Sequence, residues 1–183
     1  MSVGHFEEAL SYAKESLVRD PLSPPAFIEL CWLQQRLGHW AEAEGAARRA
    51  IEISPSYAGA HYNLGIALLN RGEGEAALSA FQKELDDGGR LGGISMADAA
   101  LGRKAESDAA LAEMLRTQAG DNAFAIAEVY GFRGQADETL QWLERAYAQK
   151  DPGLYLINGD PPLKRLELDD RYKAFLRKMK LPN

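Results

Sequence analysis

The sequence has almost no cysteine and no long apolar run. Cys31 is the only cysteine among 183 residues, so an internal disulfide is impossible and no paired-cysteine metal site exists. A lone thiol fits a reducing compartment, and we expect a cytoplasmic protein. The opening residues, MSVGHFEEAL, lack the basic and apolar regions of a signal peptide. No stretch of about 18 apolar residues could span a membrane.

Positive charge and β-branched residues are also scarce. Lys and Arg number 21 against 27 Asp and Glu, which gives a net charge of −6. This charge argues against a nucleic-acid surface, and we expect no membrane contact. Alanine is abundant while valine, isoleucine and threonine are few, so intrinsic propensity favours helix. The composition therefore favours helical structure.

A short motif built on glycine recurs along the chain. The segments GHFEEA, GHWAEA and GEGEAA begin at Gly4, Gly38 and Gly72, with a spacing of 34 residues each time. Two weaker copies, GRKAES and GQADET, begin at Gly102 and Gly134, after spacings of 30 and 32 residues. A fixed period of this length indicates a repeat architecture rather than a single closed core.

Small residues recur at fixed distances from each glycine. The fifth residue after the glycine is always small: Ala9, Ala43, Ala77, Ser107 and Thr139. The seventh residue before it is small as well: Cys31, Gly65, Ser95 and Ala127. Small side chains let two antiparallel helices approach closely, and the glycine permits the tight turn between them. Each copy is therefore predicted to be one helix pair, which needs neighbours to bury its apolar side.

This pattern resembles the tetratricopeptide repeat (TPR). The best copies are AFIELCWLQQRLGHWAEAEGAARRAIEISP and AHYNLGIALLNRGEGEAALSAFQKEL, and the resemblance covers roughly residues 4–150. It implies an all-α, right-handed α-solenoid with a C-terminal capping helix. The expected superhelix, residues 1–150, divides into a half repeat and four pairs: 4–21, 24–55, 58–87, 91–118 and 121–150. Residues 151–183 are expected to form a loop and the capping helix, the latter at about 169–179.

Two connections depart from the repeat. The segment DGGRLGG, residues 87–93, is predicted to be a loop between a helix that ends near residue 86 and one that begins near 91. The segment GLYLI, residues 153–157, lies in the C-terminal loop and could dock onto the inner face of the superhelix.

The first repeat lacks its first helix, because residue 4 already lies in the turn. We expect either that the chain is a fragment of a longer protein, or that a partner or a second copy covers the exposed end.

The residues that usually carry catalysis are explained by their repeat positions. His5 and His39 each follow a turn glycine, His61 takes a packing position, and Cys31 occupies a small-residue position. The segment GGRLGG lacks the phosphate-loop pattern and a preceding strand. We therefore predict no enzymatic activity, no catalytic residue, no cofactor and no metal site.

A partner is expected to bind the concave face, which the first helices of successive pairs line. The repeat phase places these side chains there: Ile28, Trp32, Gln35, Tyr62, Asn63, Ile66, Leu69, Met96, Ala99, Phe124 and Phe132. Nine of these residues form our predicted peptide-binding set, which leaves out Ala99 and Phe132.

Some TPR proteins bind acidic peptide ends through Lys, Arg and Asn on this face. Asn63 matches one such position, but Ile66 and Met96 stand where basic partners would be needed. An amphipathic helix or an apolar peptide suits the face better.

We thus expect a protein–protein interaction scaffold that binds a peptide or helix. The segments IAEVYGFRGQADETLQWLERAYAQKD and DDRYKAFLRKM also resemble C-terminal TPR segments of bacterial regulators that carry a nucleotide cyclase or a winged-helix domain. That resemblance implies a regulatory segment of a larger bacterial signalling protein. The alternative is a structural module that self-associates, as a homodimer, through its N-terminal end or its inner face.

Overall fold

The computed structural model describes residues 3–180, and this part of the chain is helical without any strand. The helices are α1 Val3–Arg19, α2 Pro24–Arg36, α3 Trp40–Ile53, α4 Ala60–Asn70, α5 Gly74–Phe81, α6 Asp87–Ala100, α7 Lys104–Gln118, α8 Ala123–Phe132, α9 Ala136–Gln149 and α10 Asp170–Lys178, with two short 3₁₀ helices, η1 Pro152–Leu156 and η2 Pro161–Leu166, before the last. The prediction of an all-α solenoid is confirmed.

The turns between paired helices share one conformation. Gly38, Gly72, Gly102 and Gly134 have φ between +74° and +79°, in the left-handed region that favours glycine. In every case the N–H of the following residue donates to a carbonyl five residues before it, as in His39 to Gln34 and Gln135 to Tyr130. This bonding satisfies the last carbonyl groups of the first helix, so the recurring glycine has a physical cause.

The small residues of the repeat lie where paired helices touch. Cys31, Ala43, Ala77 and Ala127 are fully buried. In the third full pair, the Ser95 hydroxyl donates to the Ser107 carbonyl at 3.0 Å, and the Ser107 hydroxyl donates to the Ser95 carbonyl at 2.8 Å. The reciprocal bonds show that α6 and α7 approach closely enough for side chains of this size to reach the opposite backbone.

The glycine-rich segment 87–93 is helical, so the predicted loop is wrong. Helix α5 ends at Phe81 rather than near 86, and α6 begins at Asp87 rather than near 91. The Asp86 carboxylate accepts the Gly89 N–H at 2.7 Å and caps α6. A Cβ at Gly93 would lie 2.0 Å from the Phe81 ring, so this glycine permits close packing of a helix rather than forming a flexible connection.

Just after the end of α5, the buried Glu84 bonds to the start of α4. Its carboxylate accepts the N–H groups of Gly59 at 3.1 Å and Tyr62 at 2.9 Å, at the start of α4. One carboxylate thus satisfies the free amides at a helix start, which would otherwise remain unpaired.

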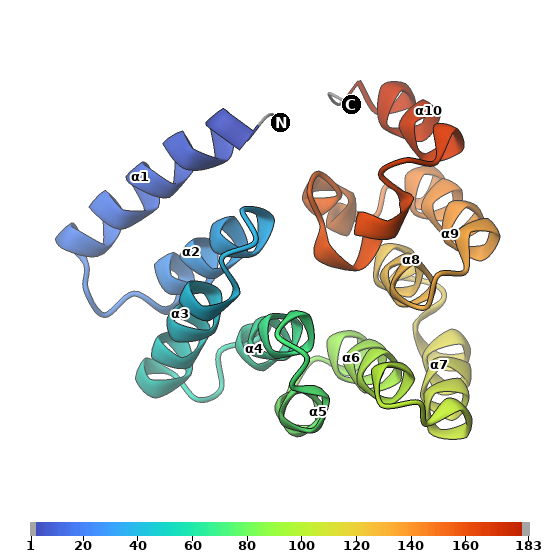
Figure 1. Cartoon of the computed structure of the whole chain (residues 1–183), viewed down its shortest axis with the longest axis horizontal. Helices are drawn as coiled ribbons and strands as arrows, with labels where there is room; N and C mark the ends of the chain where they lie inside the picture. The colour runs from blue at the N-terminus through green and yellow to red at the C-terminus, as the bar shows by residue number, and fades with distance from the viewer. Residues whose placement is uncertain (1–2, 181–183) are drawn as a thin grey trace.

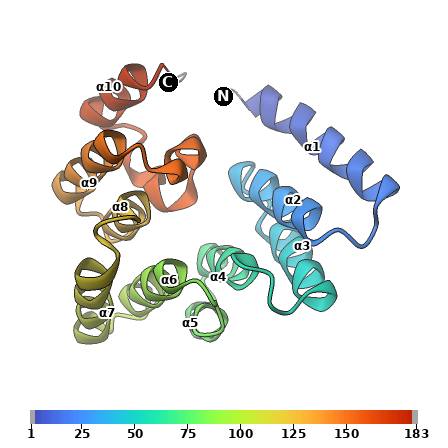
Figure 2. The same ribbon diagram turned by 180° about the vertical axis from the view of Figure 1, so that it is seen from behind.

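The helix pairs form an arc around a central segment (Figure 1). Helices α2, α4, α6 and α8 contact one another along the inner side of the arc. The segment with η1 and η2 lies inside the arc (Figure 2), and both 3₁₀ helices contact α8. We call residues 152–166 the return segment, because they lead the chain from α9 back toward α2.

Candidate partner-binding surface

The nine predicted peptide-binding residues belong to α2, α4, α6 and α8, the helices of the inner side of the arc, but most of them are buried. Trp32 and Tyr62 are half-buried. The other seven are Ile28, Gln35, Asn63, Ile66, Leu69, Met96 and Phe124, and each is at most 8% exposed. Sequence reasoning therefore located the inner side of the arc, while the accessibility of these residues is set by what packs on them.

The return segment covers the inner face of α2. The Arg36 guanidinium donates from Nη2 to the Leu156 carbonyl at 2.7 Å and from Nε to the Asn158 carbonyl at 3.0 Å. The rings of Trp32 and Tyr155 pack edge to face with centroids 6.0 Å apart. The suggestion that GLYLI docks onto the inner face thus describes this arrangement, with Arg36 as its main polar anchor.

The return segment also packs closely on α8. Leu154, Ile157, Leu163 and Leu166 are buried in one apolar cluster with residues of α8 and α9. A Cβ at Gly131 would lie 2.6 Å from a Leu163 methyl carbon and 3.1 Å from the Pro162 carbonyl oxygen. The return segment is therefore part of the core between α2 and α8, rather than a loop resting on the surface.

Two acidic side chains are buried where the return segment meets α8. The pKa of Glu128 is raised well above its usual value by burial and by the charge of Asp160. Burial likewise raises the pKa of Asp160 to about 7, although Arg36 and a hydrogen bond with Glu128 oppose the shift. Tyr62 contacts Glu128 from α4, and burial raises the pKa of its hydroxyl. The raised pKa values favour the protonated forms of these two neighbouring carboxyl groups, which titrate as a coupled pair.

Little space remains beside this cluster. The cavity bounded by Trp32, Gln35, Tyr62, Asn63, Ile66 and the return segment is about 30 Å³. Such a volume holds a water molecule rather than a peptide side chain. The middle of the inner face is consequently filled by the chain itself.

Several predicted residues have structural contacts that account for their type. The Gln35 amide donates to the Asn63 carbonyl at 3.0 Å, and the Asn63 amide donates to the Gly59 carbonyl at 2.8 Å. Leu69 and Met96 belong to the core of the arc. Phe124 packs in the cluster of the return segment, and its backbone N–H donates to the Asp151 carboxylate at 2.9 Å.

An open apolar pocket remains at the α2 end of the inner face. It measures about 440 Å³ and lies between α1, α2 and the return segment. Its aromatic lining consists of Phe6, Trp32, Tyr57 and Tyr155, with Ile28, Leu33 and Leu156 between them. We call it the α2 pocket. Trp32 and Ile28 were predicted from the repeat phase, whereas Phe6, Tyr57 and Tyr155 come from segments outside the inner helices and were missed.

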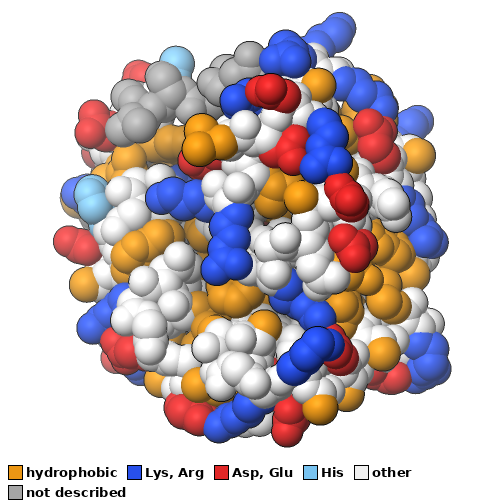
Figure 3. All heavy atoms as spheres, turned by 45° about the vertical axis from the view of Figure 1, so that its right-hand side comes forward, with side chains coloured by type: hydrophobic (Ala, Val, Ile, Leu, Met, Phe, Trp, Pro, Cys, Tyr) orange, Lys and Arg blue, Asp and Glu red, His pale blue; other side chains and the backbone are white. Residues whose placement is uncertain are grey.

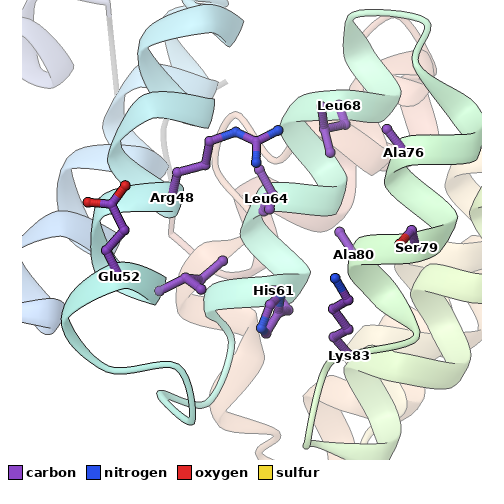
Figure 4. A pocket seen from close by; sticks show the side chains of 10 residues that line it. Arg48, Glu52, His61, Leu64, Leu68, Ala76, Ser79, Ala80 and Lys83 are labelled. Atoms are coloured by element: carbon purple, nitrogen blue, oxygen red, sulfur yellow. The ribbon is translucent and has the colours of Figure 1, made fainter.

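A second open groove lies on the opposite side of α4. It measures about 400 Å³, with Arg48 and Glu52 of α3 on one side, Lys83 and Ser79 on the other, and Leu64 and Leu68 beneath (Figure 4). His61 stands in this groove, and burial lowers the pKa of its imidazole. Its Nδ1 is buried and has no hydrogen-bond partner within residues 3–180.

The remaining surface offers neither a metal site nor a membrane segment in the part of the chain described. No group of three or more His, Cys, Asp or Glu side chains there is placed to hold a metal ion. None of the helices between residues 3 and 180 is both long and apolar enough to cross a membrane. On the face over the later helices, acidic and basic side chains are interspersed, with apolar side chains between them (Figure 3).

Solved structures with the same arrangement identify the fold. The chain is similar to TTC0263, a thermophilic TPR protein of Thermus thermophilus, at 22% identity and a TM-score of 0.63, over 97% of this chain and 92% of that one. It is also similar to PilW, a type IV pilus biogenesis factor, at 18% identity and a TM-score of 0.59, over 96% and 90% of the two chains. YrrB, a TPR protein with an unusual peptide-binding site, matches at 17% identity and a TM-score of 0.52, over 92% and 98%.

No protein-family model matches the sequence, and no curated protein matches it either. The structural similarities nevertheless extend over nearly the whole chain. The chain therefore has the tetratricopeptide-repeat fold.

Proposed function

We propose that this protein is a non-enzymatic scaffold that binds a segment of a partner protein in the α2 pocket. The observation that carries the proposal is the open aromatic lining of this pocket beside a filled inner face. Tyr155, which is 68% exposed, extends the lining toward solvent. Aromatic side chains that stay partly exposed at a concave surface contribute much of the energy of protein–protein contacts.

The return segment indicates what kind of segment fits. It lies next to the pocket as a turn-rich stretch with apolar side chains, and its carbonyl groups accept from Arg36. A partner segment that continues along this face would meet the same surface, which consists of aromatic rings and the Ile28 side chain. We therefore propose an apolar peptide in an extended or turn conformation as the ligand. A preformed pocket lowers the ordering cost of such binding.

We propose a smaller set of peptide contacts than the nine residues predicted from the repeat phase. Ile28 and Trp32 line the α2 pocket, so they remain our proposed contacts, together with Tyr155. Gln35, Tyr62, Asn63 and Ile66 border the filled middle of the face, so a peptide would reach them only after displacement of the return segment.

Selection of random peptides against the intact protein tests this function. Twelve-residue peptides that bind should be apolar, and their binding should shift the Trp32 indole N–H resonance in the NMR spectrum. Tyr155→Ala should weaken binding about tenfold without unfolding the protein, because the side chain is largely exposed. Tyr147→Ala on α9 removes an exposed tyrosine elsewhere and is the matched control. Peptides whose affinity is equal for both variants would contradict binding in the α2 pocket.

Self-association is a second candidate, favoured by exposed apolar side chains on α1 and just after it. Tyr12, Val18 and Leu22 are 63%, 84% and 61% exposed on this helix and the turn that follows it. Exposed apolar side chains grouped on one element are typical of an interface. Light scattering at increasing concentration should show a dimer that Val18→Glu dissociates, whereas a monomer throughout would eliminate this candidate.

A further inference from the structure

We propose that a pocket at the ends of α6 and α8 binds a carboxylate of an acidic segment in a partner protein. The pocket measures about 450 Å³, and we call it the basic pocket. Its lining comes from the last turn of α6, the first turn of α7, the last turn of α8 and the return segment. The lining residues are Ala99, Ala100, Gly102, Lys104, Ser107, Phe132, Arg133 and Arg165.

The charge of the lining is of one sign. Lys104, Arg133 and Arg165 contribute three cations, and no acidic side chain is among the lining residues. Asp108, just outside, pairs with both Lys104 and Arg133. Arg165 has no ion pair in the part of the chain described, so two positive charges remain uncompensated in a protein of net charge −6. A concave site of one sign concentrates ligands of the opposite sign.

The basic pocket also offers hydrogen-bond donors. Arg103 precedes α7 and no side chain accepts from the first N–H groups of this helix, whose first turn contributes Lys104 and Ser107 to the lining. The free N–H groups and the helix dipole favour an anion at this end. The Arg133 side chain is only 13% exposed, and its Nη1 has no hydrogen-bond partner within residues 3–180. This atom is shielded from solvent, so Arg133 acts on the pocket through its charge rather than as a free donor.

The apolar part of the lining suits the stem of an acidic side chain. The Arg165 guanidinium lies 5.9 Å from the centre of the Phe132 ring, which holds the cation over the pocket. Ala99, Ala100 and the Phe132 ring could contact the methylene groups of a glutamate while its carboxylate meets the cations. The structure thus gives the inner-face residues Ala99 and Phe132 an open site, on the other side of the return segment from the α2 pocket.

Titration with short acidic peptides tests the basic pocket. A fluorescein-labelled tetraglutamate peptide should bind to the intact protein in a fluorescence polarisation assay, and binding should weaken as salt rises from about 20 to 150 mM because charge attraction is screened. A tetraglutamine peptide should not bind. The variant Lys104→Gln with Arg165→Gln should bind tetraglutamate at least tenfold more weakly. Both side chains are exposed, so the variant should keep its fold, which circular dichroism verifies.

The matched control changes the same net charge far from the pocket. Lys14→Gln with Arg19→Gln, both exposed on α1, should leave the affinity within twofold of the unaltered protein. Equal weakening in the two double variants would reduce the effect to general charge attraction and overturn the proposal, as would absence of tetraglutamate binding. Preference for a phosphoserine peptide over tetraglutamate would overturn the choice of a carboxylate ligand.

The two peptide experiments can reject this inference and the proposed scaffold function independently of each other. The acidic peptides report on Lys104 and Arg165, whereas the apolar peptides report on Trp32 and Tyr155. Loss of one type of binding leaves the other measurable in the same protein.

Discussion

The arc of paired helices and the return segment are stabilised by contacts of different kinds. Within the arc, each helix packs mainly on the next helix in the chain. The return segment instead contacts α2 across a great distance in sequence: Arg36 reaches Leu156 and Asn158, 120 and 122 residues away. The comparison teaches that local contacts leave a period in the sequence, while a single long-range closure does not.

The largest effect is expected from a change that breaks the arc. Phe81 is fully buried, and the ring fills the space that Gly65 and Gly93 leave on the neighbouring helices. Phe81→Ala should lower the free energy of unfolding by about 3–5 kcal/mol, because it opens a cavity between three helices. Guanidinium unfolding followed by circular dichroism measures the loss. A decrease below about 1 kcal/mol would mean that the arc does not depend on this contact.

A change in the return segment should weaken only the contacts by which this segment covers the inner face. Ile157 is fully buried between the return segment and α8, and Ile157→Ala should cost about 2–5 kcal/mol locally. Hydrogen exchange of residues 152–166 should accelerate, while the amides of α4 to α6 keep their protection. Leu168→Ala, at a side chain that is 87% exposed, serves as the control and should change neither. Equal acceleration throughout the chain would show that arc and return segment unfold together.

Arg36, the polar anchor of the return segment, is expected to contribute less to stability. Arg36→Met keeps much of the apolar stem but removes the donors to the Leu156 and Asn158 carbonyls. Hydrogen bonds from a charged group contribute about 1.5–3 kcal/mol, so stability should fall by this order. The same hydrogen-exchange measurement should place the change in the return segment. Unaltered protection there would contradict the anchoring role of Arg36.

The last prediction is a change of stability with pH, which is spread over a range of pH rather than produced by one substitution. The pKa of Asp160 is about 7 in the folded protein, above the ordinary value of 3.8 for an aspartate. Between these values the folded state retains a proton that the unfolded state has lost. The free energy of unfolding should therefore decrease as pH rises from about 4 to 7, with a slope from this group of at most ~1.4 kcal/mol per pH unit, and level off above pH 7.

Asp160→Asn isolates this contribution, because all other titrating groups are retained. Urea unfolding at a series of pH values should give a flatter profile for the variant than for the unaltered protein between pH 4 and 7. Parallel profiles would show that Asp160 titrates normally and is not held beside Glu128.

The arc could be predicted from the sequence because each repeat carries the same local pattern of residues. A glycine in the turn and small residues on both helices identify every pair, and the turns at Gly38 and Gly134 have the same φ of +76°. The helix at 87–93 was not predictable from propensity, because close contacts account for glycines there, with Phe81 at Gly93 and with Val129 and Met114 at Gly92. The open pockets combine residues from three or more elements, so no local pattern marks them.

A distance measurement tests the central claim that the return segment closes the inner face. Nitroxide labels on Glu29→Cys and Lys164→Cys, two exposed positions on α2 and η2, report whether these elements stay together. Burial raises the pKa of the Cys31 thiol to about 12, so this cysteine should remain unlabelled. Pulsed electron paramagnetic resonance should give one narrow distribution of short distances. A broad distribution centred on longer distances would show that the inner face stands open and would contradict the account.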